Sequence, residues 1–243
     1  MTTALQCQNR ERRVRVAGSA IIMGWLFLPL AARQVMPSAE EILARIESET
    51  SQRHFVLKDY TASRLYTLQN HRFGKQAAVG VLLNYNRVEG SRYTVLTRTG
   101  SDSLNNVIDK VLASEVQASL PAQNARHQIS AENYRVRLLG TEAVSERNCY
   151  VLELTPRIKS PFLLYGKAWI DGETYGVVRL EGHFAASTSI WIGAPDIKED
   201  FVLLHGFWLP DHVRSVTNSV LLGQSEIEIA VSNYQFPADT QIP

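Results

Sequence analysis

The sequence is poor in cysteine. Only Cys7 and Cys149 occur among its 243 residues. Cys7 precedes the apolar N-terminal segment described below, so a chain that has lost this segment keeps one cysteine and cannot form an internal disulfide. We expect Cys149 to be a buried, reduced core residue, because free cysteine is among the most buried residue types.

The sequence also lacks an excess of charge. Its 25 Lys and Arg almost balance its 24 Asp and Glu. Nucleic-acid binding requires a basic surface that neutralises phosphates. The composition therefore argues against a nucleic-acid partner.

Signatures of catalysis and of metal binding are missing. There is no G-x-S-x-G elbow, P-loop, dinucleotide glycine pattern or H-E-x-x-H motif, and the six histidines do not have metal-ligand spacing. Cys149 has no neighbouring base in the sequence. An exported hydrolase would need a nucleophile and a base. We therefore predict that the protein is not an enzyme and has no catalytic residues, metal or cofactor.

The N-terminus has the pattern of an export signal. A basic segment, Arg10–Arg15, precedes the apolar run Val16–Leu30, which ends in small residues. We predict a signal peptide over residues 1–33, cleaved near Ala32, and a single periplasmic domain over residues 34–243. No cysteine follows the run as a lipid-anchoring site. An uncleaved inner-membrane anchor is the alternative.

Two helices are predicted in the remainder of the chain. Ser38 and Glu41 have capping-box spacing at the start of the first, and the second follows Ser101 and ends before Pro121. A polar loop with a short helical turn is expected from Ala122 to Glu132. The apolar residues expected to face a sheet are Ile42, Leu43, Ile46, Val107, Ile108 and Val111.

Alternating apolar residues predict strands over most of the rest of the chain. The short links between the later strands favour an antiparallel meander. The fold class is α+β and mainly β, with a curved antiparallel sheet, an open and incomplete β-barrel, whose concave apolar face is covered by helices. The predicted strands are Tyr60–Leu68, Ala77–Tyr85, Tyr93–Thr97, Tyr134–Leu139, Cys149–Thr155, Tyr165–Asp171, Val177–Gly182, Ser189–Ile192, Ile197–His205, Trp208–Thr217 and Ser225–Tyr234.

The last strand shows that the sheet has two unlike faces. Ile227, Ile229 and Val231 share one face, while Glu226 and Glu228 share the other. An apolar concave face of this kind either closes on a core or holds a ligand. The aromatic residues of the C-terminal half leave the same two alternatives open, core packing or the wall of a lipid-sized pocket.

Five segments resemble strands of the LolA-like family, which contains periplasmic lipoprotein carriers and outer membrane lipoprotein-sorting proteins. They are Asn148–Pro156, Gly166–Asp171, Tyr175–Gly182, Gly206–Pro210 and Ile227–Phe236. The resemblance implies an open β-barrel with helices as a lid over an apolar cavity. It also implies a monomer that carries acyl chains of lipids or lipoproteins, with a membrane donor or receptor protein as a further partner. The alternative is a sensor or regulatory module of the same fold that binds a periplasmic protein.

The resemblance also suggests ligand-binding residues. In the carriers, an arginine at the end of an early strand holds the lid closed, and Arg87 aligns with it, although Val88 stands where the carriers have proline. A solvated turn arginine is the alternative for Arg87. The candidate ligand-binding residues are Val81, Leu83, Trp169, Trp191 and Arg87.

Overall fold

A computed structural model describes residues 36–186, 195–219 and 223–237. The chain divides into two compact units, Met1–Met36 and Pro37–Pro243, and the description below concerns the second. The predicted signal peptide with its cleavage position, and the predicted strand Ser189–Ile192, lie outside the described residues.

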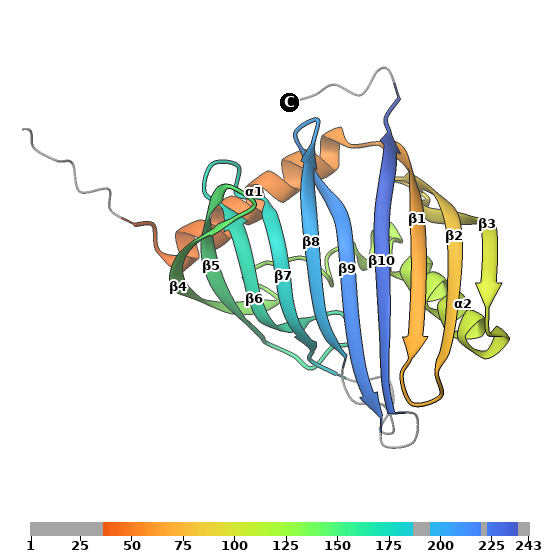
Figure 1. Cartoon of the computed structure of the whole chain (residues 1–243). Helices are drawn as coiled ribbons and strands as arrows, with labels where there is room; N and C mark the ends of the chain where they lie inside the picture. Colours follow the sequence, from red (N-terminus) through yellow and green to blue (C-terminus); the bar gives the residue numbers. More distant parts are fainter. Residues whose placement is uncertain (1–35, 187–194, 220–222, 238–243) are drawn as a thin grey trace, which may run out of the picture. The chain divides into compact units, whose positions relative to one another are not determined.

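The second unit is dominated by one antiparallel sheet (Figure 1). Its order is β3-β2-β1-β10-β9-β8-β7-β6-β5-β4. The strands are β1 (Asp59–Asn70), β2 (Lys75–Asn86), β3 (Gly90–Gly100), β4 (Tyr134–Val144), β5 (Arg147–Pro156), β6 (Leu164–Asp171), β7 (Val177–Phe184), β8 (Asp196–Leu204), β9 (Phe207–Ser219) and β10 (Gly223–Gln235).

Strands that follow one another in the sequence are neighbours in the sheet, with one exception. β3 and β4 form its two edges and do not pair within the described chain, while the first strand, β1, pairs with the last, β10. The sheet is therefore curved and open, which confirms the predicted fold class.

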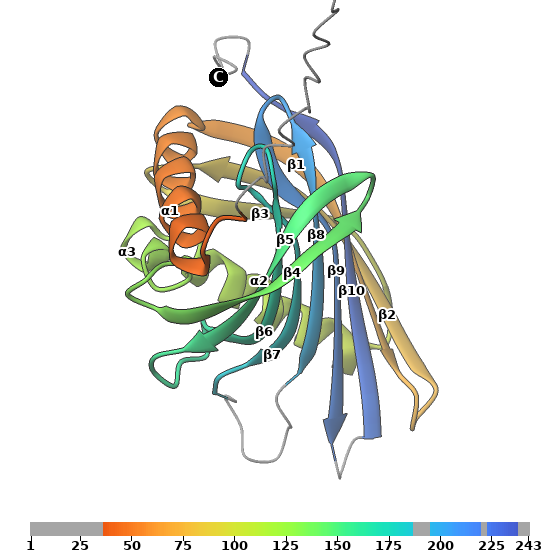
Figure 2. The same ribbon diagram turned by 90° about the vertical axis from the view of Figure 1, so that its left-hand side faces the viewer.

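Three helices are described: α1 (Ala39–Val56), α2 (Asp102–Ala118) and the short α3 (Pro121–Asn124). α1 begins with the predicted capping box, in which the Glu41 amide donates to Ser38 Oγ and the Ser38 amide donates to the Glu41 carboxylate. Figure 2 shows α1 and α2 on the concave side of the sheet. None of these described helices is long and apolar enough to cross a membrane.

The helices bury different parts of the concave face. Ile42 and Ile46 of α1 pack with residues of β5 and β6, among them Leu152 and Ile170. Ile108 and Leu112 of α2 pack with residues of β1 and β2, including Val79, Val81 and Leu83. The two helices therefore cover the two ends of one curved face.

The expected sheet-facing residues are largely confirmed. Leu43 is buried, and Val111 packs against the cluster beneath α2. Val107 is 42% exposed, so its prediction was wrong. The buried side chains of α2 are Asn105, Ile108 and Leu112, a stripe that leaves Val107 on the side of the helix turned away from the sheet.

A third cluster lies on the opposite, convex face. Cys149, Val151 and Trp169 belong to it, whereas Ala168 and Ile170, the sequence neighbours of Trp169, pack beneath α1. Cys149 is 0% exposed and free, and burial raises the pKa of its thiol. The prediction that Cys149 is a buried core residue is confirmed, and its reduced state stays a prediction.

Candidate functional site

The middle of the concave face is apolar and only half-buried. Leu180 on β7, Val213 on β9 and Ile227 on β10 retain part of their accessible surface, although each packs against one of the two concave clusters. Val81 and Leu83, beneath α2, are 1% and 0% exposed. We call the half-buried region the central concave face, defined by Leu180, Ile197, Glu199, Val213 and Ile227.

Its exposure follows from where the helices lie. α1 packs against β4, and α2 packs against β1, β2 and β3. Strands β7–β9, which lie between those regions in the sheet order, receive less helical cover. An apolar surface that water reaches favours the binding of an apolar ligand, since its burial releases that water.

A polar cluster ties α2 to the sheet beside this face. Glu115 Oε2 accepts hydrogen bonds from Arg64 Nη1 (2.8 Å), the Tyr66 hydroxyl (2.8 Å) and the Tyr93 hydroxyl (2.5 Å). Burial and the Glu115 charge raise the pKa of both tyrosines, so their hydroxyls remain protonated and donate. We call Arg64, Tyr66, Tyr93 and Glu115 the inner polar cluster.

Sequence reasoning missed the inner polar cluster, although its members carry a signal. Arg64 shares one face of β1 with the buried Ala62 and Tyr66, so its side chain points into the concave side. Glu115 continues the buried stripe of α2 at helical spacing from Ile108 and Leu112. A charged residue within the buried pattern of β1 and another within that of α2 were the available indication that Arg64 and Glu115 meet.

Glu199 lies at the centre of the central concave face. Its cross-strand neighbours are Leu180 and Val213. No hydrogen bond or ion pair joins it to another residue of the described chain. Burial raises its pKa to about 7; the positive charge of Arg64 opposes the shift, and the carboxylates of Glu115 and Asp200 add to it.

Two properties of Glu199 together describe its surroundings. The carboxyl lies deep among protein atoms, yet the residue is only half-buried by accessible surface. Part of the residue therefore remains accessible to water. Sequence reasoning missed Glu199 because it stands in the charged run Lys198–Asp200. Strand alternation was the available signal, since it places Glu199 on the opposite face of the sheet from Lys198 and Asp200.

The structure separates the candidate residues named from the sequence. Val81 and Leu83 belong to the core beneath α2. Trp169 lies on the convex face, where its Nε1 donates to Glu142 Oε2 (2.9 Å) and the Arg179 guanidinium lies 5.9 Å from its ring centroid. It therefore does not share the face of Val81 and Leu83. Trp191 lies outside the described residues.

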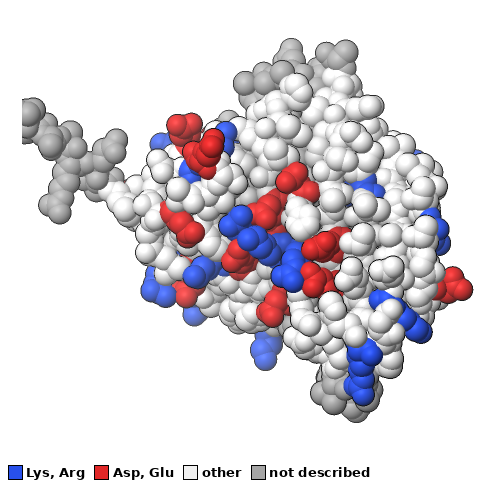
Figure 3. Space-filling view, in the orientation of Figure 1, with Lys and Arg blue, Asp and Glu red and all other residues white. Residues whose placement is uncertain are grey.

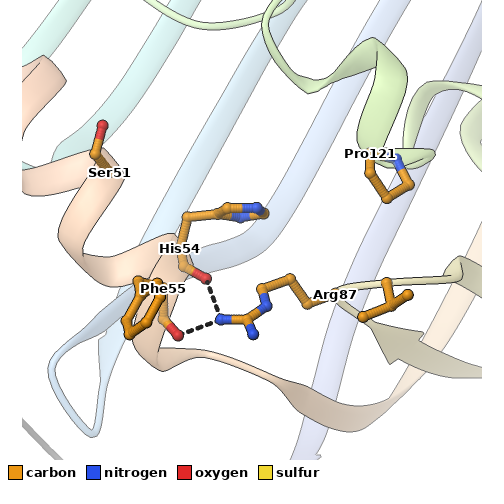
Figure 4. A pocket seen from close by; sticks show the side chains of 6 residues that line it. Ser51, His54, Phe55, Arg87 and Pro121 are labelled. Carbon is orange, nitrogen blue, oxygen red and sulfur yellow. Dashed lines mark hydrogen bonds between the residues drawn. The ribbon is translucent and has the colours of Figure 1, made fainter.

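Arg87 contacts the C-terminal end of α1 (Figure 4). Its Nη1 donates to the carbonyls of His54 (3.4 Å) and Phe55, and its guanidinium lies 5.4 Å from the Phe55 ring centroid. The last carbonyls of a helix lack intrahelical donors, and a cation there interacts favourably with the helix dipole. Arg87 thus joins the β2–β3 turn to α1 and, with Val88 and Pro121, lines a pocket of about 410 Å³.

The convex face differs in character from the concave one. Figure 3 shows charged side chains of both signs gathered in its middle. Arg179 pairs with Asp200 (2.5 Å), and Lys198 with Glu181 (3.3 Å). Arg214 pairs with Glu226 (2.5 Å). These charges satisfy one another, and the half-buried apolar surface lies on the other side of the sheet.

No protein-family model and no curated protein matches the sequence. The chain is similar to the solved structure of a DUF1329 family protein from Desulfovibrio piger, at 12% identity and a TM-score of 0.42, over 84% of this chain and 95% of that one. A LolA superfamily protein from Nitrosomonas europaea matches at 11% identity and a TM-score of 0.43, over 86% and 96%. An outer membrane lipoprotein-sorting protein domain from Vibrio parahaemolyticus matches at 16% identity and a TM-score of 0.40, over 80% and 92%. The names of the last two proteins are those of the LolA-like family that the sequence resembles.

Proposed function

We propose that the protein is an exported, non-enzymatic carrier that holds acyl chains of a lipid or lipoprotein on the central concave face. The observation that carries the proposal is the exposure of apolar side chains in the middle of this face, between regions that α1 and α2 bury. Each methylene removed from water contributes about 0.8 kcal/mol, so an acyl chain of ordinary length would bind firmly to such a surface.

A carrier must also release its cargo, and α1 is the element suited to move. Its N-terminal half packs on the sheet through Ile42 and Ile46, whereas its C-terminal end is held by two arginines. Arg87 donates to its last carbonyls, and Arg53 of α1 itself donates to the Thr174 carbonyl in the β6–β7 turn (2.5 Å). A few polar contacts at one end of a helix can open without disrupting the sheet, which is the behaviour expected of a lid.

The chain offers a matched pair of variants to test the proposal. Val213 and Val216 lie on the same strand, Val213 on the concave face and Val216 beside Arg214 and Glu226 on the convex face. In Val213→Trp the indole occupies the space that the acyl chain needs, whereas in Val216→Trp it adds an apolar side chain of the same size elsewhere.

The readout is displacement of an apolar fluorescent dye by an uncharged monoacylglycerol. We expect the wild type and Val216→Trp to bind the dye and release it to the competitor, and Val213→Trp to lose at least about tenfold in affinity. Equal binding by both variants would contradict the proposal. Failure of the folded wild type to bind would do so as well and would favour the alternative of a module that binds a protein partner through its surface.

A further inference from the structure

The carboxyl group of Glu199 is the polar feature of the central concave face that the carrier function leaves unexplained. It projects from the middle of β8 between two apolar side chains, Leu180 and Val213, on neighbouring strands. Burying a carboxylate without a partner is costly, and the usual remedy is a hydrogen bond or an ion pair. No described residue supplies one.

The charged groups around Glu199 do not neutralise it. Arg64 of β1 is the cation that acts on it, but this guanidinium already donates to Glu115 of α2 over 2.8 Å. Besides Arg64 and Glu199 itself, the groups that act on the nearby Tyr234 of β10 are a phenol and an acid, Tyr60 of β1 and Asp211 of β9. Asp200, the next residue along β8, is paired with Arg179 on the convex face. Among the described residues that act on it, Glu199 therefore has no cation of its own.

An amphiphile could complete this arrangement. Its tail would lie against the apolar residues of the central concave face, and its head would reach the carboxyl among them. A cationic head that also donates hydrogen bonds satisfies an ionised carboxylate best, and such an ion pair is stronger in a water-poor site than in solvent. A carboxylate head would instead meet a like charge.

We propose that the central concave face prefers amphiphiles with a protonated primary amine, which Glu199 holds through a charge-assisted hydrogen bond. This inference rests on the proposed carrier function, because it requires that an acyl or alkyl chain enters the same face. It adds the chemistry of the head group that the site selects.

The test compares three ligands of equal chain length: dodecylamine, dodecanol and dodecanoic acid, each competing with the apolar dye. The proteins are the wild type, Glu199→Gln and the control Glu228→Gln, which removes a carboxylate from the convex face of β10, where Glu228 lies 4.0 Å from Arg214. At pH 8 we expect the wild type to bind the amine about tenfold more tightly than the alcohol, and the acid most weakly.

The variants and the pH dependence identify the group responsible. Glu199→Gln should bind amine and alcohol alike, and Glu228→Gln should behave as the wild type. In the wild type, the preference for the amine should disappear at pH 5, where Glu199 is protonated while the amine keeps its charge. Binding of all three ligands with equal affinity, or a preference for the amine that survives Glu199→Gln, overturns the inference and leaves the carrier function standing. Failure of every ligand to displace the dye overturns both.

Discussion

The carboxylate of Glu115 on α2 lies 2.8 Å from the guanidinium of Arg64 on β1 and joins the helix to the sheet. Both side chains are largely buried, with 12% of Arg64 and 26% of Glu115 exposed. Two tyrosine hydroxyls donate to the same carboxylate oxygen. The pair therefore fixes α2 over one end of the concave face and leaves the middle of that face uncovered.

Removal of one partner from this pair should destabilise the fold. We expect Glu115→Ala to lower the free energy of unfolding by about 3 kcal/mol, because it leaves the Arg64 guanidinium buried without its counter-ion. Urea denaturation measures the change. The control is Glu89→Ala, which breaks the exposed Glu89–Arg92 pair (2.8 Å) and should cost less than about 1 kcal/mol. Equal losses in the two variants would show that the inner polar cluster does not hold α2.

Arg87 should control the mobility of the end of α1. Arg87→Ala removes two hydrogen bonds to the last carbonyls of the helix, a loss of about 1 kcal/mol for a partly exposed contact. Amide hydrogen exchange should become faster in the last turn of α1 and remain unchanged in β1 and β10. Arg92→Ala, which removes a nearby exposed arginine, serves as the control. Unchanged exchange in α1 would mean that Arg87 does not restrain the end of this helix.

The titration of Glu199 should be visible in the stability of the protein. Because burial raises the pKa of Glu199 to about 7, the folded protein binds its proton more tightly than the unfolded chain does. The contribution of Glu199 to the free energy of unfolding is therefore fully present below the ordinary pKa of a glutamic acid, and it is lost as the pH rises through about 7. The test compares the wild type with Glu199→Gln. Both proteins keep the charged and titratable groups around position 199, which are Arg64, Glu115, Asp200, Asp211 and Tyr234.

Relative to the wild type, Glu199→Gln should gain stability between pH 5 and pH 8, by on the order of 1–3 kcal/mol. Urea denaturation at several pH values measures the difference between the two proteins. Glu228→Gln should show no such trend. If the stability of Glu199→Gln relative to the wild type does not change with pH, the carboxyl of Glu199 in the wild type lies in ordinary solvent.

Cys149 should resist chemical modification in the folded protein. It is 0% exposed, and burial raises the pKa of its thiol, so the reactive thiolate is scarce and inaccessible. A maleimide reagent should label it in denaturant and leave it unlabelled in buffer. Rapid labelling of the native protein would show that the convex cluster around Cys149 opens readily.

Local patterns predicted much of the fold. The spacing of Ser38 and Glu41 predicted the start of α1, and the alternation of Ile227 with Glu228 predicted a sheet with two unlike faces. The pairing of β1 with β10 was not predictable in this way, because its partners Tyr66 and Ile229 are far apart in the sequence.

The candidate site was harder to predict for the same physical reason. Periodicity tells which residues share a face and does not tell which face is concave. Residues of β6 pack on both sides of the sheet, so alternation separated Trp169 from Ile170 without showing that Trp169 is on the convex side. Arg64 and Glu115 each departed from an apolar pattern, but only the folded chain brings them together.

The most direct test of the central claim is to locate a bound acyl chain. A monoacylglycerol with a photoreactive diazirine in its chain, irradiated with the folded protein and analysed by peptide mass spectrometry, reports the residues that the chain touches. We expect labels on Leu180, Val213 or Ile227, reduced by unlabelled competitor and by Val213→Trp. Labels confined to the convex face, around Val216 and Arg214, or labelling of the folded protein no greater than that of the denatured chain, would contradict the account.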